Sequence, residues 1–331
     1  MAEWGWSAGT ARGPGGSRNF KLWTPKTRER NSAWPLVMLL HGCTHNAREM
    51  AEISGMNDVA EASGFLTVYP EQSRVANLLK CWNWFDPKHQ TRDAGEPSIL
   101  AAVVEQVRST QNIDAERVYL VGVSAGGAMA SILAATYPEL FAAVAIFAGA
   151  EFKAATSVSE GFAAMERGGP DPVRQGQLAF EAMSSGLARK KRRRMPVIVF
   201  HGTADTRVSV LNADQAIAQW SKTNACLAAE HSENGLALTE EIVPGEAPNG
   251  YAYRKHIYRE PDARLLMEKW LVQGLGHAWS GSPRASKYGD PKGPNASAEI
   301  WRFFCEAGSD RVSSLTSSSS GQQEVSRETV K

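Results

Sequence analysis

The residue with the clearest chemical potential is Ser124, which lies in the segment Gly-Val-Ser-Ala-Gly at 122–126. An apolar stretch of strand length precedes this segment, and a helix-forming stretch of small residues follows it from Gly127. Where G-x-S-x-G joins a strand to a helix, the turn is tight and carries the serine hydroxyl at the edge of a sheet. Small flanking residues avoid collisions at such a turn. We therefore predict that Ser124 is a nucleophile; the alternative is a glycine-rich turn with an incidental serine.

A serine hydroxyl is a weak nucleophile near neutral pH, so it needs a base within hydrogen-bond reach and an acid that orients the base. Where a G-x-S-x-G turn is catalytic, the chain order is serine, then Asp or Glu after a later strand, then histidine. Asp205 follows an apolar strand predicted at 196–201, and His277 lies in a glycine-containing loop after another predicted strand. We predict that both complete a triad with Ser124. Asp214 is the nearest rival for the acid, and Asp205 could instead cap its own turn.

Position separates His277 from the six other histidines of the chain. His41 and His201 end predicted strands, where we expect them to hydrogen-bond loop backbone. His256 falls within a predicted strand, and the histidines of polar segments should be solvated. The competitors for the role of base are thus His41, His45, His89, His201, His231 and His256.

Acyl transfer passes through a tetrahedral oxyanion, which preorganised backbone N–H groups must meet. One donor is expected from the residue after the nucleophile, and the other from the loop after an early central strand. The first is Ala125. For the second we predict Cys43, in the loop His-Gly-Cys-Thr at 41–44, with Thr44 as the close alternative. That loop could also be an ordinary strand exit.

Apolar stretches of strand length alternate with helical patterns along most of the chain, which predicts an α/β fold with a mainly parallel central sheet and helices on both faces. Combined with the G-x-S-x-G turn, this pattern predicts the α/β-hydrolase fold. The expected strands are 20–23, 35–41, 64–69, 117–122, 141–147, 196–201, 251–258 and 263–272. The expected helices are 56–62, 97–111, 126–135, 212–223 and 296–305.

We expect one catalytic domain at 18–308, without internal repeats. Within it, 149–195 loosens into helical stretches that suit an insertion or lid. Residues 1–17 are expected to be a flexible N-terminal segment. The tail at 309–331, rich in Ser, Gln and charge, should be disordered, and the basic run at 189–194 should be a solvated helix end.

The composition excludes some classes of partner. The chain has 331 residues, 43% of them apolar, which is ample for a packed core. Lys and Arg number 36 and Asp and Glu 35, so the net charge of +1 gives no reason to expect nucleic acid or an anionic membrane as partner. No stretch approaches the roughly 20 apolar residues of a membrane span. A neutral or small substrate fits better.

Short motifs spread over the chain also support a hydrolase site around Ser124. They are His-Gly-Cys-Thr at 41–44, Tyr-Pro-Glu-Gln at 69–72, Cys-Trp-Asn-Trp-Phe at 81–85, Gly-Val-Ser-Ala-Gly-Gly at 122–127, His-Gly-Thr-Ala-Asp at 201–205, His-Ala-Trp-Ser at 277–280, Gly-Pro-Asn-Ala-Ser at 293–297 and Trp-Arg-Phe-Phe at 301–304. In this order they resemble the polyhydroxybutyrate (PHB) depolymerase family of esterases, which is related to acetylxylan and feruloyl esterases. The resemblance implies a serine hydrolase with no metal and no cofactor, acting on short-chain hydroxyalkanoate or related carboxylic esters.

The same resemblance implies a small ester or a polyester oligomer as substrate and an extracellular or periplasmic location. No export signal is visible at the N-terminus, so we expect a cytoplasmic location if the start is genuine. No separate substrate-binding domain follows the catalytic part, which favours soluble oligomers or small esters over a crystalline polymer. We expect a monomer or a homodimer. His45 stands where the family more often has Gln.

Flat apolar side chains are expected at the edge of the sheet that carries the triad. Trp82, Trp84 and Trp279 lie in loops that such a fold brings there, where they could hold an acyl or polyester chain. Packing of aromatic loop residues is the alternative.

The four cysteines form no Cys-x-x-Cys motif, so we expect no zinc or redox centre of that kind. Cys43 and Cys81 begin two loops expected at the same edge, which predicts a disulfide that braces the oxyanion loop. A second disulfide is expected between Cys226 and Cys305. Four buried thiols are the alternative.

Other functions share these features. A peptidase or an acyltransferase can use the same triad, because fold and triad do not name the acceptor. A catalytically inactive binding protein on the same scaffold is the alternative from a different class.

Overall fold

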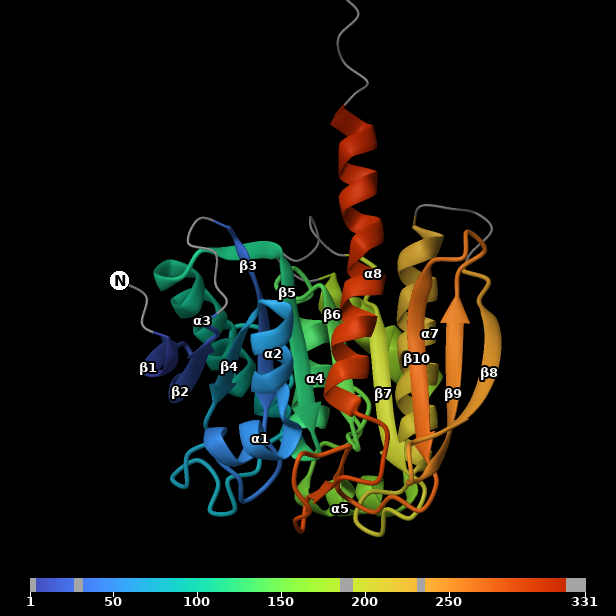
Figure 1. The fold of residues 1–331 in the computed structure, drawn as a ribbon, viewed down its shortest axis with the longest axis horizontal. Helices are drawn as coiled ribbons and strands as arrows, with labels where there is room; N and C mark the ends of the chain where they lie inside the picture. Colours follow the sequence, from blue (N-terminus) through green and yellow to red (C-terminus); the bar gives the residue numbers. More distant parts are fainter. Residues whose placement is uncertain (1–3, 27–31, 185–192, 231–235, 320–331) are drawn as a thin grey trace, which may run out of the picture.

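A twisted ten-stranded sheet runs through the molecule, with strand order β1-β2-β4-β3-β5-β6-β7-β10-β9-β8 (Figure 1). The structure is a computed structural model that describes residues 4–26, 32–184, 193–230 and 236–319. The central strands are parallel, as predicted, and their nearly continuous apolar sequences suit burial on both faces. These strands are β4 (Leu66–Pro70), β3 (Trp34–Leu40), β5 (Ile113–Val123), β6 (Ala143–Phe147), β7 (Val197–Gly202) and β10 (Leu265–Val272).

Antiparallel strands extend the sheet at both edges. On one side they are β2 (Gly16–Thr24) and β1 (Gly5–Gly13), and on the other β9 (Ala252–Arg259) and β8 (Thr239–Glu246). The predicted pair β9 and β10 is confirmed, whereas β8 was not predicted. Most of β8 is exposed, and its Pro244 suits an edge strand, because proline cannot donate a ladder hydrogen bond.

The prediction that residues 1–17 are flexible is wrong for the part that the structure describes. Strand β1 pairs with β2 along its whole length. Trp6 contacts Trp23 edge-on, with ring centroids 5.4 Å apart, and Ala11 is buried. The small residues of β1 carry little strand preference of their own. Pairing and cross-strand contacts therefore determine this edge strand, and propensity does not reveal it.

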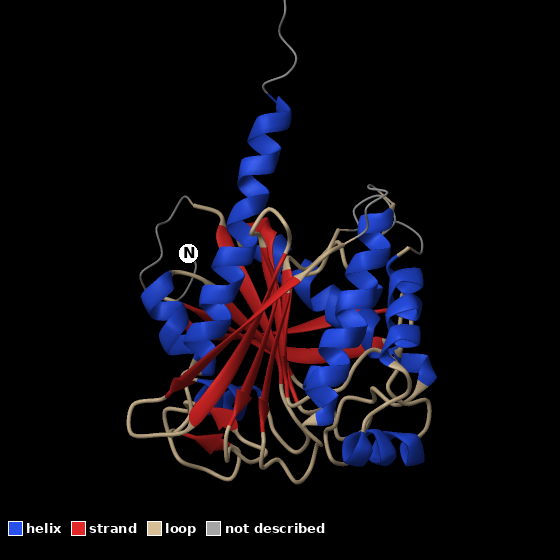
Figure 2. Cartoon of the chain, turned by 90° about the vertical axis from the view of Figure 1, so that its right-hand side faces the viewer, coloured by secondary structure: helices blue, strands red, loops and turns tan. Residues whose placement is uncertain are grey.

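Helices cover both faces of the sheet (Figure 2), as the α/β prediction requires. Two separate apolar cores result, one on each face. The first face carries α3 (Gly95–Thr110), α4 (Ala125–Thr136), α6 (Pro172–Met183) and α7 (Leu211–Ala229). The second carries α1 (Ala47–Ser54), α2 (Met56–Ser63) and α8 (Ala296–Ser319).

The predicted insertion at 149–195 and the predicted tail at 309–331 are both described in part. The described part of 149–195 contains the helices α5 (Val158–Arg167) and α6, and α5 lies at the end of the molecule where the strands lead into loops (Figure 1). Residues 185–192, with most of the basic run, are outside the described residues. The tail differs from the prediction up to Ser319, because α8 continues to that residue and no proline interrupts it. Residues 320–331 are outside the described part.

The predicted disulfide between Cys226 and Cys305 is wrong, because both residues are free thiols. Cys226 is on α7 and Cys305 on α8, and these helices pack on opposite faces of the sheet. The sheet keeps the two sulfur atoms apart. The Cys226 thiol instead donates a hydrogen bond to Gln177 at 3.3 Å.

Glu151, in the loop after β6, is a buried carboxyl group. It is 0% exposed, and neither carboxyl oxygen has a hydrogen-bond partner among the described residues. Burial, with a smaller contribution from the charge of Asp171, raises the pKa of Glu151 to about 9. The side chain is therefore protonated at neutral pH in the folded protein.

We expect Glu151→Gln to remove part of the pH dependence of folding. Unfolding lets Glu151 ionise near its ordinary pKa of 4.5, whereas the folded protein keeps the proton up to about pH 9. The stabilising contribution of the protonated group is complete below the lower value and is lost as the pH rises toward the higher one. Urea unfolding at pH 5, 7 and 9 should show a steeper loss of stability for the wild type than for Glu151→Gln. Identical profiles would contradict the assignment, and Glu181→Gln on the exposed side of α6 is the control.

Candidate active site

Ser124 sits in a strained turn between β5 and α4. Its backbone has φ 57° and ψ −123°, a conformation that non-glycine residues rarely adopt. The turn leaves no room for larger flanking residues. A Cβ atom on Gly122 would lie 2.0 Å from the Gly126 carbonyl oxygen, and one on Gly126 would lie 2.2 Å from the Leu40 oxygen. The strain and the crowding are those of the strand-to-helix turn in which a G-x-S-x-G motif exposes its serine.

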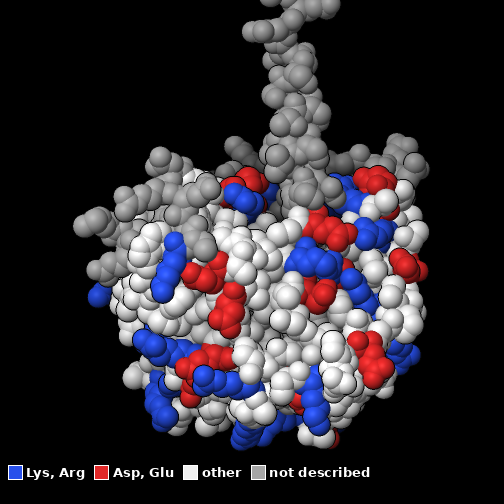
Figure 3. Space-filling view, in the orientation of Figure 1, with Lys and Arg blue, Asp and Glu red and all other residues white. Residues whose placement is uncertain are grey.

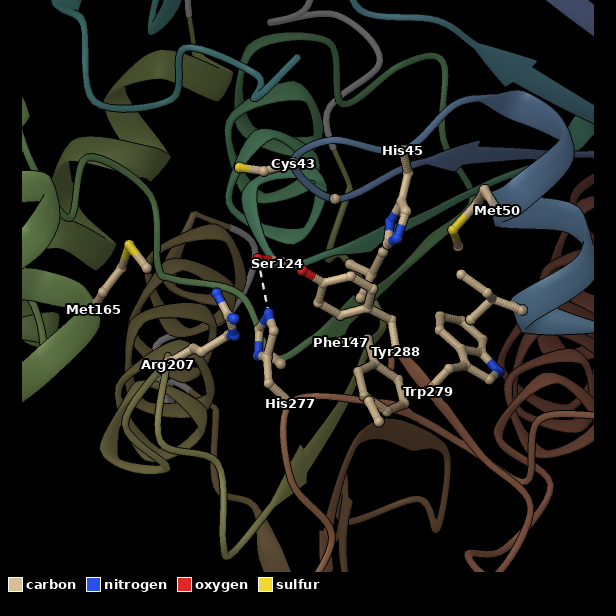
Figure 4. A pocket seen from close by; sticks show the side chains of 15 residues that line it. Cys43, His45, Met50, Ser124, Phe147, Met165, Arg207, His277, Trp279 and Tyr288 are labelled. Carbon is tan, nitrogen blue, oxygen red and sulfur yellow. Dashed lines mark hydrogen bonds between the residues drawn. The ribbon is translucent and has the colours of Figure 1, made fainter. Parts of the chain in front are cut away.

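His277 reaches Ser124 from a loop after β10. The Ser124 hydroxyl and His277 Nε2 are 3.1 Å apart (Figure 4). The loop is tied to the one after β7, since the Ala204 N–H donates to the Leu275 carbonyl at 3.0 Å. Both loops leave the carboxyl ends of neighbouring parallel strands, so they meet at one edge of the sheet.

Asp205 is held so that one oxygen faces His277. Its Oδ1 accepts hydrogen bonds from the N–H groups of Arg207 and Val208, at 2.8 and 2.9 Å. Its Oδ2 lies 2.6 Å from His277 Nδ1 and 3.5 Å from His201 Nε2. Burial alone would raise the pKa of Asp205, but hydrogen bonds from His201 and His277 hold it well below its usual range.

These contacts determine which ring nitrogen of His277 carries the proton. An ionised Asp205 can only accept hydrogen bonds, so the proton of the neutral ring is on Nδ1 and Nε2 is the acceptor. The Ser124 hydroxyl then donates to Nε2. The predicted convergence of the three side chains is therefore present in the structure, whereas the rival Asp214 lies on α7 and binds Lys269 at 2.6 Å.

The two residues predicted to supply the oxyanion donors both lie close to Ser124: Ala125 follows it in the chain, and Cys43 lines the same pocket. Ala125 is the first residue of α4. In the neighbouring loop, a Cβ on Gly42 would lie 3.4 Å from the Ser124 Cβ. The Thr44 N–H already donates to the Leu79 carbonyl at 2.6 Å, while no acceptor is recorded among the described residues for the N–H of Cys43. This difference favours Cys43 over Thr44 as the second donor.

A buried network holds this oxyanion loop. His41 Nδ1 donates to the Gly42 carbonyl at 2.7 Å, and the Gln72 N–H donates to His41 Nε2 at 3.0 Å. Burial lowers the pKa of His41 to about 4, so the ring is neutral and can serve both contacts. The contacts of His41, and that of His201 Nε2 with the Val208 carbonyl at 2.9 Å, confirm the expectation that these histidines bind loop backbone.

The disulfide predicted between Cys43 and Cys81 is confirmed. It ties the oxyanion loop to the loop that follows β4. The Trp82 indole N–H, next in sequence, donates to the His41 carbonyl at 3.1 Å. Two independent links therefore restrain the position of the Cys43 N–H.

Removal of this disulfide should lower kcat more than it changes KM. In a Cys43→Ala/Cys81→Ala variant we expect kcat to fall about tenfold, because a misplaced oxyanion donor stabilises the transition state less. Steady-state kinetics with 4-nitrophenyl acetate measures this loss. Cys226→Ala is the matched control and should behave as the wild type. An unchanged kcat in the double variant would show that the link does not position the donor.

The three tryptophans proposed to contact substrate have different positions. Trp82 and Trp84 are 0% and 5% exposed and belong to the core on the α4 face, so the prediction that they bind substrate is wrong. Trp82 supports the oxyanion loop, and Trp84 packs beside Gly161 of α5. Trp279 lines the pocket next to Ser124, where its ring stacks on Phe147 with centroids 4.7 Å apart.

That pocket has a volume of about 100 Å³ and opens beside Ser124 and His277 (Figure 4). One wall is apolar. His45, which departs from the family pattern, also lines the pocket. Among the lining residues that the sequence did not indicate are Met50, Ile53, Met165, Arg207 and Tyr288. They come from α1, α5 and separate loops, and none belongs to a motif or a long periodic pattern, so no local sequence signal marked them.

The described residues contain neither a cluster of metal-binding side chains nor a membrane-spanning helix. Over 4–26, 32–184, 193–230 and 236–319, no group of three or more His, Cys, Asp or Glu side chains could hold a metal ion. None of the helices in these ranges combines the length and apolar character required to cross a bilayer.

The parallel sheet with helices on both faces, the strained serine turn and the adjoining aspartate and histidine loops define an α/β-hydrolase. Solved structures agree on the fold. The acetyl xylan esterase from Aspergillus awamori superposes with a TM-score of 0.61 at 22% identity, over 82% of this chain and 94% of that one.

Sequence comparison identifies the family. The family model "Esterase PHB depolymerase" matches residues 19–244. Poly(3-hydroxyalkanoate) depolymerase C of Paucimonas lemoignei is 31% identical over 265 residues, which are 80% of this chain and 59% of that protein. Feruloyl esterase B of Neurospora crassa is 30% identical over 266 residues, 78% of this chain and 83% of the relative. The chain belongs to the PHB depolymerase family of esterases, a family of carboxylic ester hydrolases. It spans less than two thirds of the length of the depolymerase.

Proposed function

We propose that this protein is a serine esterase that hydrolyses short-chain carboxylic or hydroxyalkanoate esters through an acyl-enzyme intermediate. One observation carries the proposal: the chain of hydrogen bonds from the Ser124 hydroxyl to His277 and on to Asp205. In this role Ser124 is the nucleophile, His277 the general base and Asp205 the carboxylate that orients the imidazole.

The proposed reaction has two balanced halves. His277 Nε2 takes the proton of Ser124 as Oγ attacks the ester carbonyl carbon, and the oxyanion accepts hydrogen bonds from the N–H groups of Cys43 and Ala125. Collapse breaks the bond to the alcohol oxygen, which receives the proton from His277. Water, activated by the same imidazole, then attacks the acyl-enzyme, releasing the carboxylic acid and restoring Ser124.

The size of the pocket supports a small acyl group. Its volume of about 100 Å³ is well below the roughly 300 Å³ at which ligand pockets for larger molecules begin. Trp279 and Phe147 form a rigid apolar wall, since they stack on each other and are almost fully buried. An acetyl or a short hydroxyacyl group fits such a space better than a long chain.

A series of 4-nitrophenyl esters tests this size limit. We expect kcat/KM for acetate and butyrate esters to exceed that for the decanoate by at least about tenfold, because the excess methylenes cannot enter the pocket. Trp279→Ala should narrow this difference by enlarging the pocket. A preference for decanoate in the wild type would contradict the proposed acyl site.

A second candidate is a carbohydrate esterase of the acetylxylan or feruloyl type. The small pocket favours acetyl over feruloyl within this alternative, because a feruloyl group is much larger. Parallel assays on 3-hydroxybutyrate oligomers, acetylated xylan and feruloyl esters would separate the candidates by kcat/KM. A catalytically inactive binding protein would hydrolyse none of them.

A further inference from the structure

Two cationic side chains stand over one aromatic ring at the rim of the pocket. The Arg207 guanidinium lies 5.9 Å and the Lys287 ammonium 5.1 Å from the centroid of the Tyr288 ring. Tyr288 and Arg207 also line the pocket beside Ser124. The triad does not use either charge.

Neither cation forms an ion pair among the described residues. Within the part of the chain that the structure describes, no carboxylate lies within 4 Å of the charged group of Arg207 or Lys287. The carboxylate of Asp205 is committed to His277 and His201, and only the backbone N–H of Arg207 contacts it. The rim therefore carries two cationic groups without an ion-pair partner among the described residues, although the chain as a whole is nearly neutral. Two carboxylates, Glu166 and Asp205, line an outer cavity that Arg207 also lines. Over the face shown in Figure 3, acidic and basic side chains are intermixed, and several Lys and Arg side chains lie along its lower margin.

Arg207 also marks the boundary between two spaces. Besides the small pocket, it lines an outer cavity of about 500 Å³, and Met165 is likewise shared by both. In Figure 4 Arg207 lies beside His277 on the side of Met165, opposite the wall formed by Trp279 and Met50. An ester bound at Ser124 with its acyl group against that wall would direct its alcohol part past Arg207.

We propose that Arg207, assisted by Lys287, binds a carboxylate on the alcohol part of the ester, so that the preferred substrates are esters of hydroxy acids with a free carboxyl group. A guanidinium group binds a carboxylate through two parallel N–H···O contacts, which gives orientation as well as charge. The last ester bond of a short hydroxyalkanoate oligomer is one such substrate. Glu166 and Asp205 also line the outer cavity. The Asp205 carboxylate is bound by His277 and by two backbone N–H groups, whereas Glu166 would repel an anion placed too far from Arg207. The carboxylate is therefore expected only a few bonds from the ester oxygen.

This inference rests on the proposed esterase function, and a matched substrate pair tests it separately. The pair is 3-acetoxybutanoate and 3-acetoxybutanamide, which have the same shape and the same leaving oxygen and differ in charge. Release of acetate measures kcat/KM for each. We expect the wild type to prefer the carboxylate by about tenfold, mainly through KM, and the preference to shrink between about 20 mM and about 500 mM salt.

Variants identify the side chain responsible. Arg207→Gln should bring the ratio of the two kcat/KM values close to one. Arg207→Lys should keep part of the preference, because a point charge remains without the planar fork. Lys287→Gln should reduce it less. Arg254→Gln, an exposed arginine on β9 without a carboxylate partner among the described residues, removes the same charge elsewhere and should leave the ratio unchanged.

The results separate a wrong carboxylate site from a wrong esterase proposal. A wild type without preference for the carboxylate, an Arg207→Gln variant that retains the preference, or an equal loss in Arg254→Gln would overturn the carboxylate site. If the wild type cleaves 4-nitrophenyl acetate but neither acetoxy compound, the carboxylate site is wrong and the esterase proposal stands. If it cleaves no ester at all, the esterase proposal itself is wrong.

Discussion

Replacement of Ser124 by alanine should reduce kcat for 4-nitrophenyl acetate by about 10⁴-fold or more. The variant lacks the hydroxyl that attacks the carbonyl carbon in the proposed mechanism, and His277 Nε2 lies 3.1 Å from that hydroxyl. The remaining activity would come from oxyanion stabilisation and binding alone. Initial rates at saturating substrate, measured with purified protein, give the ratio.

The control for this variant must exclude unfolding. Alanine differs from serine only by the missing hydroxyl, so we expect it to occupy position 124 at the same φ of 57°. Circular dichroism and the urea midpoint should then stay close to those of the wild type. Ser131→Ala, on α4 but away from the pocket, is a second serine replacement that should retain activity. A folded Ser124→Ala variant with undiminished kcat would exclude the proposed nucleophile.

The second large effect is expected for Asp205→Asn, with a loss of about 10⁴-fold in kcat. The backbone N–H groups of Arg207 and Val208 require an acceptor at the Oδ1 position, so the asparagine oxygen must stay there. Its NH₂ group then faces His277 Nδ1 and can only donate to it. This contact places the imidazole proton on Nε2, where it cannot accept the proton of Ser124.

The pH profile distinguishes this tautomer effect from a loss of structure. In the wild type, burial opposes ionisation of Asp205, but its hydrogen bonds hold its pKa below the usual range. The carboxylate should therefore stay ionised throughout the pH range of an activity assay. Asp205→Asn should lower kcat across that whole range. Asp214→Asn removes the rival carboxylate on α7 and should leave kcat unchanged; a large loss in that variant would contradict the assignment.

The sequence predicted those parts of the fold and site that local patterns encode. The central strands contain long apolar stretches, and the turn around Ser124 has a motif whose flanking elements are recognisable. Asp205 and His277 follow from chain order, because parallel strands place their following loops at one edge of the sheet. Cys43 and Cys81 were paired by the same reasoning.

Other features depend on contacts between distant segments, and local patterns do not encode those. Strand β1 is maintained by pairing with β2, and its own residues have low strand preference. Cys226 and Cys305 are on helices that pack on opposite faces of the sheet, a separation that no local sequence pattern indicates. Trp82 is in a loop, yet it points into the core and supports His41, so proximity to a motif did not reveal its direction.

The walls of the pocket were missed for the same reason. Tyr288, Arg207 and Met165 come from three separate segments, and each is unremarkable within its own stretch of sequence. Only the folded chain brings them to the serine. The residues that perform the proposed chemistry were thus easier to predict than those that choose its substrate.

The most direct test of the central claim is to trap the acyl-enzyme. The protein is mixed with excess 4-nitrophenyl acetate, quenched with acid within the first turnovers, digested and examined by mass spectrometry. We expect one acetyl group per chain, attached to the peptide that contains Ser124, and none in Ser124→Ala. An acetyl group on a different residue of an active enzyme, or wild-type turnover in the alanine variant, would contradict the proposed mechanism.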